Sequence, residues 1–221
     1  SLYRYSNDLL SRNGVSIYIA PPSHTLETLP ATERMYWLMN HEMVHVANMD
    51  AANSQDLRWR SFFGGKPRQS RDHPESIIYS YLAAPRITVP RWYLEGAATF
   101  METWMAGGVG RAQGAYDEMV FRAMVRDRSY FYDPLGLESE GTKIDFQVGA
   151  KSYLYGARFV AYLAYTYGPE PFLRWAARTD GSRGYYSRQF AAVYGRPVDA
   201  VWREWIDWEQ NFQHANLDSL R

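Results

Sequence analysis

Residues 30–52 read PATERMYWLMNHEMVHVANMDAA. After the first position this stretch contains no Gly or Pro, and its apolar side chains recur at the three- and four-residue spacing of a helix. We therefore predict one long helix with His41-Glu-Met-Val-His45 in its middle. Histidines four positions apart lie about one turn apart on the same helix face. Both imidazoles can then reach a single metal ion.

Glu42 follows the first histidine of this motif. On a helix its carboxylate is turned away from the ion, where it can hold a metal-bound water and accept its proton. The motif thus predicts two metal ligands and a general base. The alternative interpretation, that His41 and His45 form a capped or solvated pair on a helix face, stays open at this point.

A catalytic zinc site needs a third protein ligand and an open position for water. The chain contains no Cys, so a transition metal must be bound by His and carboxylate groups. We favour Glu95, because Pro90 begins a second predicted helix that ends at Gly107-Gly108 and can present a fixed carboxylate. The other histidines are less suitable, since they lie in an irregular segment or near the chain ends (His24, His73, His214).

Glu102 lies seven residues after Glu95, nearly two helical turns, and so falls on the same helix face. From there it can orient a metal-binding imidazole from the second shell. The alternative is a solvated surface acid, which is common on exposed helix faces.

The remaining pattern predicts a strand at residues 15–19 and an irregular excursion at 54–89 with a short helix or strand. Further helices are predicted at 115–126, 148–167, 170–177, 187–194 and 198–212, with a loop at 127–143. Trp202, Trp205 and Trp208 recur every three residues, which favours core packing over an exposed stripe.

The sequences HEMVH at 41–45 and WYLEG at 92–96 resemble the gluzincin metallopeptidases, in particular the aminopeptidase N family. That family has Trp three residues before its ligand Glu, Gly directly after it, and a second Glu seven residues on, as here. It also has a Tyr three residues before a Gly, which matches Tyr153 and Gly156. The resemblance implies that Tyr153 stabilises the oxyanion. Tyr155 is an alternative by proximity, and either Tyr could be a packing residue.

The resemblance covers about residues 30–49 and 88–170. The stretch between His45 and Glu95 is longer than in the family, so residues 50–89 look like an insertion near the cleft. No Gly-x-Met-Glu-Asn segment, which the aminopeptidases use to bind a free amine, is found. The insertion is locally basic and either selects acidic groups on a substrate or is a solvated loop; its cations are Arg58, Arg60, Lys66, Arg68 and Arg71.

Composition limits the class of protein. The 221 residues are 46% hydrophobic and 22% charged, which is ordinary for a folded chain. Lys plus Arg equals Asp plus Glu at 24 each, so no overall field favours nucleic acid, and apolar stretches are too short for a membrane span. The chain starts with neither Met nor a leader, which favours a removed targeting segment and a periplasmic or secreted location.

We therefore expect an α+β zincin-like fold: one domain over residues 1–221, with a small N-terminal sheet and both motif helices in 1–106 and a mostly helical lobe in 107–221. The expected function is a zinc metallopeptidase acting on peptides or proteins, in which Glu42 activates a zinc-bound water. The alternatives are a zinc hydrolase of a non-peptide bond and a metal-retaining binding module without catalysis.

Overall fold

The computed structural model describes residues 34–105, 107, 111–113, 115–139 and 148–220. The first elements within the described residues are α2 (Arg34–Asp50), α3 (Ser54–Phe63), α4 (Ser76–Ala83), the 3₁₀ helix η2 (Pro85–Thr88) and α5 (Arg91–Met105). They are followed by the 3₁₀ helix η3 (Arg111–Gln113), α6 (Ala115–Arg126), α7 (Pro134–Ser139) and α8 (Val148–Tyr167). The chain ends with α9 (Pro169–Ala176), α10 (Tyr186–Tyr194) and α11 (Val198–Ser219).

The expected α+β fold class is wrong, because the part of the chain that the structure describes contains helices and no strand. Apolar surface is buried by helix against helix, so these residues form an all-α structure. The strand predicted at 15–19 lies outside the described residues. The excursion at 54–89 is also more helical than expected, and α7 lies within the segment predicted as a loop.

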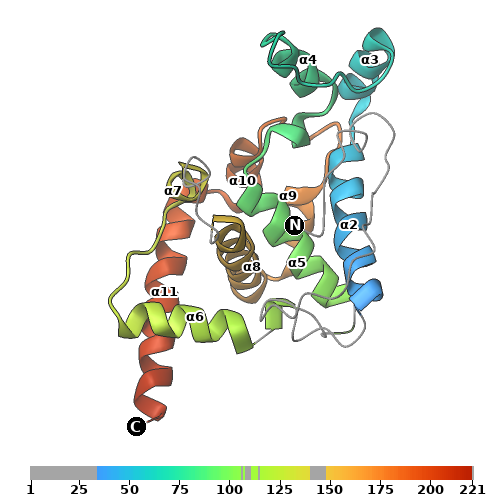
Figure 1. Ribbon diagram of the computed structural model, residues 1–221. Helices are drawn as coiled ribbons and strands as arrows, with labels where there is room; N and C mark the ends of the chain where they lie inside the picture. The colour runs from blue at the N-terminus through green and yellow to red at the C-terminus, as the bar shows by residue number, and fades with distance from the viewer. Residues whose placement is uncertain (1–33, 106, 108–110, 114, 140–147, 221) are drawn as a thin grey trace.

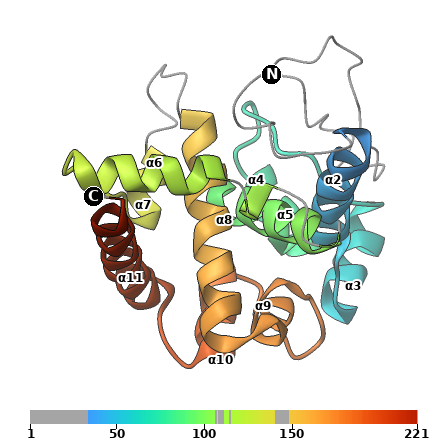
Figure 2. The ribbon, with the colours of Figure 1, turned by 90° about the horizontal axis from the view of Figure 1, so that it is seen from below.

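Helix α5 lies in the middle of the fold, with α2 on one side and α8 on the other (Figures 1 and 2). Helices α6 and α11 pack together beyond α8, and α9 and α10 pack at its C-terminal end. Helices α3 and α4 pair into a hairpin that stands off from the C-terminal end of α2 (Figure 1). The arrangement brings the two predicted motif helices into direct contact.

The core is made largely of aromatic rings from four helices. Trp92 of α5 packs on Phe159 of α8, Trp175 of α9 and Trp202 of α11, with ring centroids 4.8 to 6.4 Å apart. Edge-to-face and tilted pairs of this kind contribute roughly 0.5–1.5 kcal/mol each beyond their buried area. The predicted core role is confirmed for Trp202 and Trp205, which are fully buried, whereas Trp208 is partly buried and packs against the edge of this core.

Two charged pairs join elements that are distant in sequence. Arg158 of α8 donates to both oxygens of Glu209 of α11, with the shortest contact at 2.6 Å. Arg178, after α9, donates to both oxygens of Asp56 of α3 at 2.7 Å. Both carboxylates are buried, so each must be paired to avoid a large desolvation penalty. These pairs fix α11 to the bundle and the α3–α4 hairpin to the body of the protein.

Candidate metal centre

The histidines of the HExxH motif lie side by side on α2. His41 and His45 are 2% and 1% exposed, and their ring centroids are 4.7 Å apart. The Nε2 atoms of the two rings are 3.0 Å apart. The one-turn spacing therefore aims both imidazoles at the same point, as the sequence predicts.

Glu95 of α5 completes a group of three ligand atoms. Its Oε2 lies 3.3 Å from Nε2 of His41 and 3.3 Å from Nε2 of His45. In a tetrahedral zinc site with bonds of about 2.0–2.1 Å, neighbouring ligand atoms are about 3.3 Å apart. The three side chains thus have the chemistry and the spacing that a zinc ion requires. Among the described residues, they form the group of His and acidic side chains that could hold a metal ion.

The carboxylate of Glu95 is held in its ionised form. Burial alone would raise the pKa of Glu95. Hydrogen bonds and charge interactions with His41 and His45 outweigh burial, so the pKa of this carboxyl lies well below its usual value. A buried anion beside two imidazoles is a suitable environment for a divalent cation, which needs a deprotonated carboxylate.

Glu102 lies on the same face of α5 as Glu95 and is completely buried, so the surface-acid interpretation is wrong. Its Oε2 lies 2.7 Å from Nδ1 of His41. Arg111 of η3 donates to both oxygens of Glu102 at 2.8 Å, and its Nη2 is also 2.9 Å from Nδ1 of His41. Since an ionised carboxylate is only an acceptor, the contact at 2.7 Å has Nδ1–H of His41 donating to Glu102, while Arg111 donates to the same carboxylate. Nε2 of His41 then keeps a lone pair for a metal.

Arg111 is the residue that the sequence interpretation missed. It comes from the short turn η3, after Gly107, which has the left-handed φ of 69°. Its charge offsets that of the buried Glu102 carboxylate, and this pairing, opposed by burial, lowers the pKa of Glu102. No spacing rule links an Arg in a turn to a Glu nine residues earlier, so only a general search for partners of the buried acid could have found it.

Glu42, the predicted general base, is 3% exposed. Burial raises its pKa, while the charges of His41 and His45 act in the opposite direction. A carboxyl group with a raised pKa holds a transferred proton more readily than a free glutamate does. The structure therefore places Glu42 within the electrostatic environment of the three ligand side chains.

Tyr153 reaches the site from α8. Its ring stacks on the ring of His41 at a centroid distance of 5.9 Å and an interplanar angle of 24°. Burial and the nearby Glu95 carboxylate raise the pKa of Tyr153, which keeps its hydroxyl protonated. Tyr155 instead lies in the core, where its oxygen accepts a hydrogen bond from the backbone N–H of Tyr132. The geometry thus separates the two candidates, and Tyr153 is the one at the site.

The close approach of α5 and α8 explains both glycines of the motifs. A Cβ at Gly96 would lie 2.3 Å from the carbonyl carbon of Gly156, and a Cβ at Gly156 would lie 2.1 Å from the carbonyl oxygen of Trp92. Any side chain at either position would hold the helices apart. The glycines next to Glu95 and after Tyr153 therefore allow these two side chains to meet.

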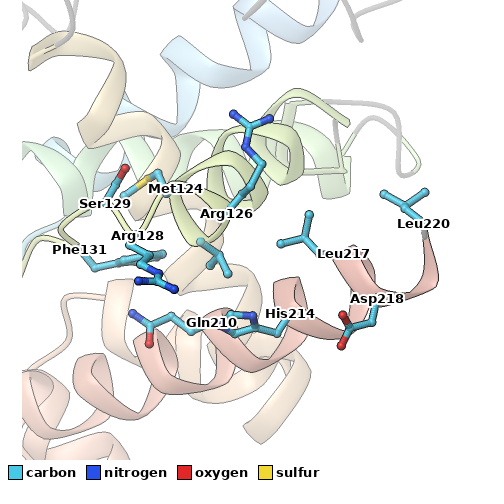
Figure 3. Close-up of a pocket in the computed structure, with 11 residues that line it drawn as sticks. Met124, Arg126, Arg128, Ser129, Phe131, Gln210, His214, Leu217, Asp218 and Leu220 are labelled. Atoms are coloured by element: carbon cyan, nitrogen blue, oxygen red, sulfur yellow. The ribbon is translucent and has the colours of Figure 1, made fainter.

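The other histidines are elsewhere. His73 is exposed near the start of α4, with Nδ1 3.2 Å from Glu75. His214 of α11 lines a pocket of about 700 Å³ between α6 and α11, together with Phe131 and Gln210 (Figure 3). Figure 1 shows that these two helices lie on the far side of α8 from α2. His24 lies outside the described residues.

The cations of the 50–89 segment have different environments. Arg60 and Lys66 contact Asp50 at 3.3 and 3.1 Å, so they connect the hairpin to the end of α2. The other three are exposed (Arg58, Arg68, Arg71). Arg60 and Lys66 therefore have a structural role, because they hold the α3–α4 hairpin against the end of α2.

Comparison of the chain with protein-family models, curated proteins and solved structures gave no match. Among the described helices, none combines the length and apolar character needed to cross a bilayer. The geometry of the site is therefore the basis on which a function can be assigned.

Proposed function

We propose that the protein is a zinc-dependent peptidase of the gluzincin type, with His41, His45 and Glu95 as the metal ligands. The observation that carries the proposal is the convergence of their three ligand atoms at 3.0 to 3.3 Å from one another. Two His and one Glu form a ligand set that catalytic zinc sites use, with a fourth position left for water. Zinc held there supplies a Lewis acid and lowers the pKa of water.

Each remaining residue of the site has a defined task. Glu42 accepts a proton from the attacking water and returns it to the leaving amine. Tyr153 donates its hydroxyl proton in a hydrogen bond to the oxyanion that forms at the attacked carbonyl. Glu102 holds the N–H of His41, and Arg111 holds Glu102, so that the ring cannot rotate away from its metal-binding position.

The resemblance of HEMVH and WYLEG to the aminopeptidase N family supports a peptide as the substrate. The arrangement of Tyr153 beside His41 and Glu95 supports it further, because a phenol at this point serves a carbonyl that becomes tetrahedral. Acyl transfer to water thus agrees with every side chain in the cluster.

The test is metal analysis of the purified protein, followed by cleavage of a peptide library with and without a chelator. We expect one zinc per chain and cleavage that the chelator abolishes. The Glu42→Gln variant should keep zinc and lose activity by at least about 100-fold, since it removes the general base. Glu75→Gln, at an exposed position, is the matched control and should behave as the parent.

Three results would overturn the proposal or a part of it. If Glu42→Gln were as active as the parent, the assignment of the base would be wrong. If the zinc-loaded protein cleaved esters or other bonds but no peptide, the metal site would stand and the substrate class would not. If it cleaved nothing, the protein would be a metal-binding module.

A further inference from the structure

The pocket between α6 and α11 is separate from the metal centre (Figure 3). Its volume is about 700 Å³, within the range of roughly 300–1,000 Å³ that small-molecule sites have. A water molecule takes up about 30 Å³, so an inorganic anion would fill only a small part of this space. The pocket is therefore large enough for an organic molecule.

Arg128, which lines this pocket, ends α6 in a conformation that an Arg rarely adopts. Its φ is 54°, and among the described residues it is the one non-glycine residue with a positive φ. The N–H of Arg128 donates to the carbonyl of Val125 at 3.2 Å, and the N–H of Ser129 donates to that of Met124 at 2.8 Å. These two hydrogen bonds form a Schellman motif, in which the left-handed residue is usually Gly.

Other helices of this chain have Gly at the corresponding position. Gly64 ends α3 with a φ of 70°, and Gly195 ends α10 with a φ of 71°. Gly adopts this conformation without the steric cost that a Cβ brings. The backbone at the end of α6 therefore favours Gly, and an Arg there lowers the stability of the fold. A residue that breaks a local rule of stability points to a function of its side chain.

The Arg128 side chain is exposed and makes no hydrogen bond or ion pair within the part of the chain that the structure describes. Figure 3 shows its guanidinium at the same end of the pocket as Gln210, whereas Asp218, the acidic residue that also lines the pocket, is at the other end. His214 lies one turn after Gln210 on α11, between it and Asp218. The five N–H donors of the guanidinium are thus available to a bound anion.

Much of the remaining wall is apolar. Phe131 and Leu217 both line the pocket, and the protein itself only half-buries them. Moving the apolar surface of a ligand from water onto these side chains is favourable. One unpaired guanidinium balances the single charge of a carboxylate, whereas a phosphate monoester carries a charge of about −1.5 to −2. The pocket therefore fits a molecule that has a carboxylate at one end and an apolar body.

We propose that this pocket binds an amphipathic carboxylate, with its two oxygens on the guanidinium of Arg128 and its apolar part against Phe131 and Leu217. The planar fork of a guanidinium matches both oxygens of a carboxylate, which a Lys ammonium cannot do. The carboxylate belongs either to a free aliphatic acid or to a C-terminal apolar residue of a peptide, and both present the same chemistry. The site shares no residue with the metal centre, so it does not rest on the proposed peptidase function.

The test is calorimetry on the full chain in the presence of a chelator, so that no acid binds to a metal ion and no peptide is cleaved. The probes are octanoate and an acetylated tripeptide that ends in Phe, each compared with its amide. We expect the preferred acid to bind about 10- to 100-fold more tightly than its amide, as a hydrogen bond between charged groups predicts. The pair that shows the difference identifies the source of the carboxylate. Inorganic phosphate should bind more weakly than the preferred acid, because it has no apolar part.

Variants then assign the binding to Arg128. Arg128→Gln should reduce the affinity for the acid to that for the amide and leave the amide unchanged. Arg203→Gln removes an exposed cation of α11 outside the pocket and is the matched control that should keep the difference. Arg128→Gly should lose the same affinity and yet raise the Tm by about 2–4 °C, because it relieves the left-handed strain. Opposite changes in binding and in stability separate a ligand-binding role from a structural one.

Equal affinities of acid and amide in both pairs would overturn the proposal, and so would an acid affinity that Arg128→Gln leaves unchanged. Phosphate binding as tight as that of the preferred acid would also overturn it, since the apolar wall would then contribute nothing. A fall in the Tm of Arg128→Gly would show that this Arg supports the fold, which removes the reason to assign it to a ligand. Each of these results leaves the peptidase standing, because metal analysis and cleavage depend on other residues.

Discussion

Replacing Gly156 by Ala tests the contact between α5 and α8 on which the site depends. The new Cβ would lie 2.1 Å from the carbonyl oxygen of Trp92, whereas ordinary van der Waals contact begins at 3.4 Å. Because the opposing atom is backbone, no rotamer change can relieve the clash, and α8 must move away from α5 by roughly 1 Å. Overpacking costs about 1–3 kcal/mol, and a rigid backbone contact should be near the upper value.

The expected effects are a lower Tm and a loss of activity that exceeds what unfolding alone would cause. At about 2–4 °C per kcal/mol for a chain of this size, the Tm should fall by about 6–12 °C. Tyr153 is on α8 and Glu95 is on α5, so separation of the helices moves the phenol away from the ligand. A misplacement of about 1 Å can lower the rate about 100-fold. The loss should therefore be seen in kcat/KM measured at temperatures well below the Tm, where the variant is still folded.

Thermal unfolding followed by circular dichroism, together with peptide cleavage, measures both effects. The matched control is Gly181→Ala, where no atom lies within 4 Å of the new Cβ and the backbone is not left-handed. This variant should be neutral or more stable by up to about 1 kcal/mol. If Gly156→Ala had the same Tm and activity as Gly181→Ala, the close helix contact would not be needed, and the explanation of the motif glycines would fail.

Further predictions concern the supporting charges and the metal. Arg111→Met should weaken zinc binding by about 10- to 100-fold in competition with a chromophoric chelator, and an unchanged affinity would exclude a role in orienting His41. A chelator should lower the Tm of the parent but not that of His45→Ala, because metal that binds only the folded state stabilises it. Asp56→Asn should lower the free energy of unfolding in urea by about 3–5 kcal/mol, because it leaves the buried Arg178 side chain without its carboxylate. Glu204→Gln, in the exposed pair with Arg196, is the control, and a loss in Asp56→Asn as small as in this control would contradict the prediction. In the metal-free protein the pKa of Glu102 lies below the ordinary 4.5, so the ionised carboxylate stabilises the folded state above about pH 4.5 and this stabilisation is lost as the pH falls further. The difference in free energy of unfolding between the parent and Glu102→Gln should therefore shrink below that pH, and a difference that stays constant would refute this role of Glu102.

The candidate metal-binding residues could be predicted because their placement depends on local periodicity. The four-residue spacing of His41 and His45 and the seven-residue spacing of Glu95 and Glu102 each define one face of one helix. A helix is determined mainly by residues near in sequence, so both faces could be predicted from the sequence. The two faces come together because α2 packs on α5. Residue spacing within each helix does not determine this packing.

The features that the sequence interpretation missed have different physical causes. Arg111 is brought to Glu102 by the turn η3, and no periodic signal marks it. Helix α3 did have a readable signal: Asn53 accepts a hydrogen bond from the N–H of Asp56, the Asp56 side chain accepts one from Asn53, and Gly64 ends the helix in a left-handed conformation. The expected sheet came from one alternating segment at 15–19 together with a family resemblance, and helices supply the described core instead.

The placement of two carboxylates on one helix also limits how the chain can change in length. Deleting or inserting one residue between Glu95 and Glu102 would rotate the second by about 100° relative to the first. Glu102 would then leave Nδ1 of His41, and Arg111 would lose its partner. Length variation in this gene should therefore be tolerated in surface connections such as the one between α3 and α4, and rejected within residues 96–101.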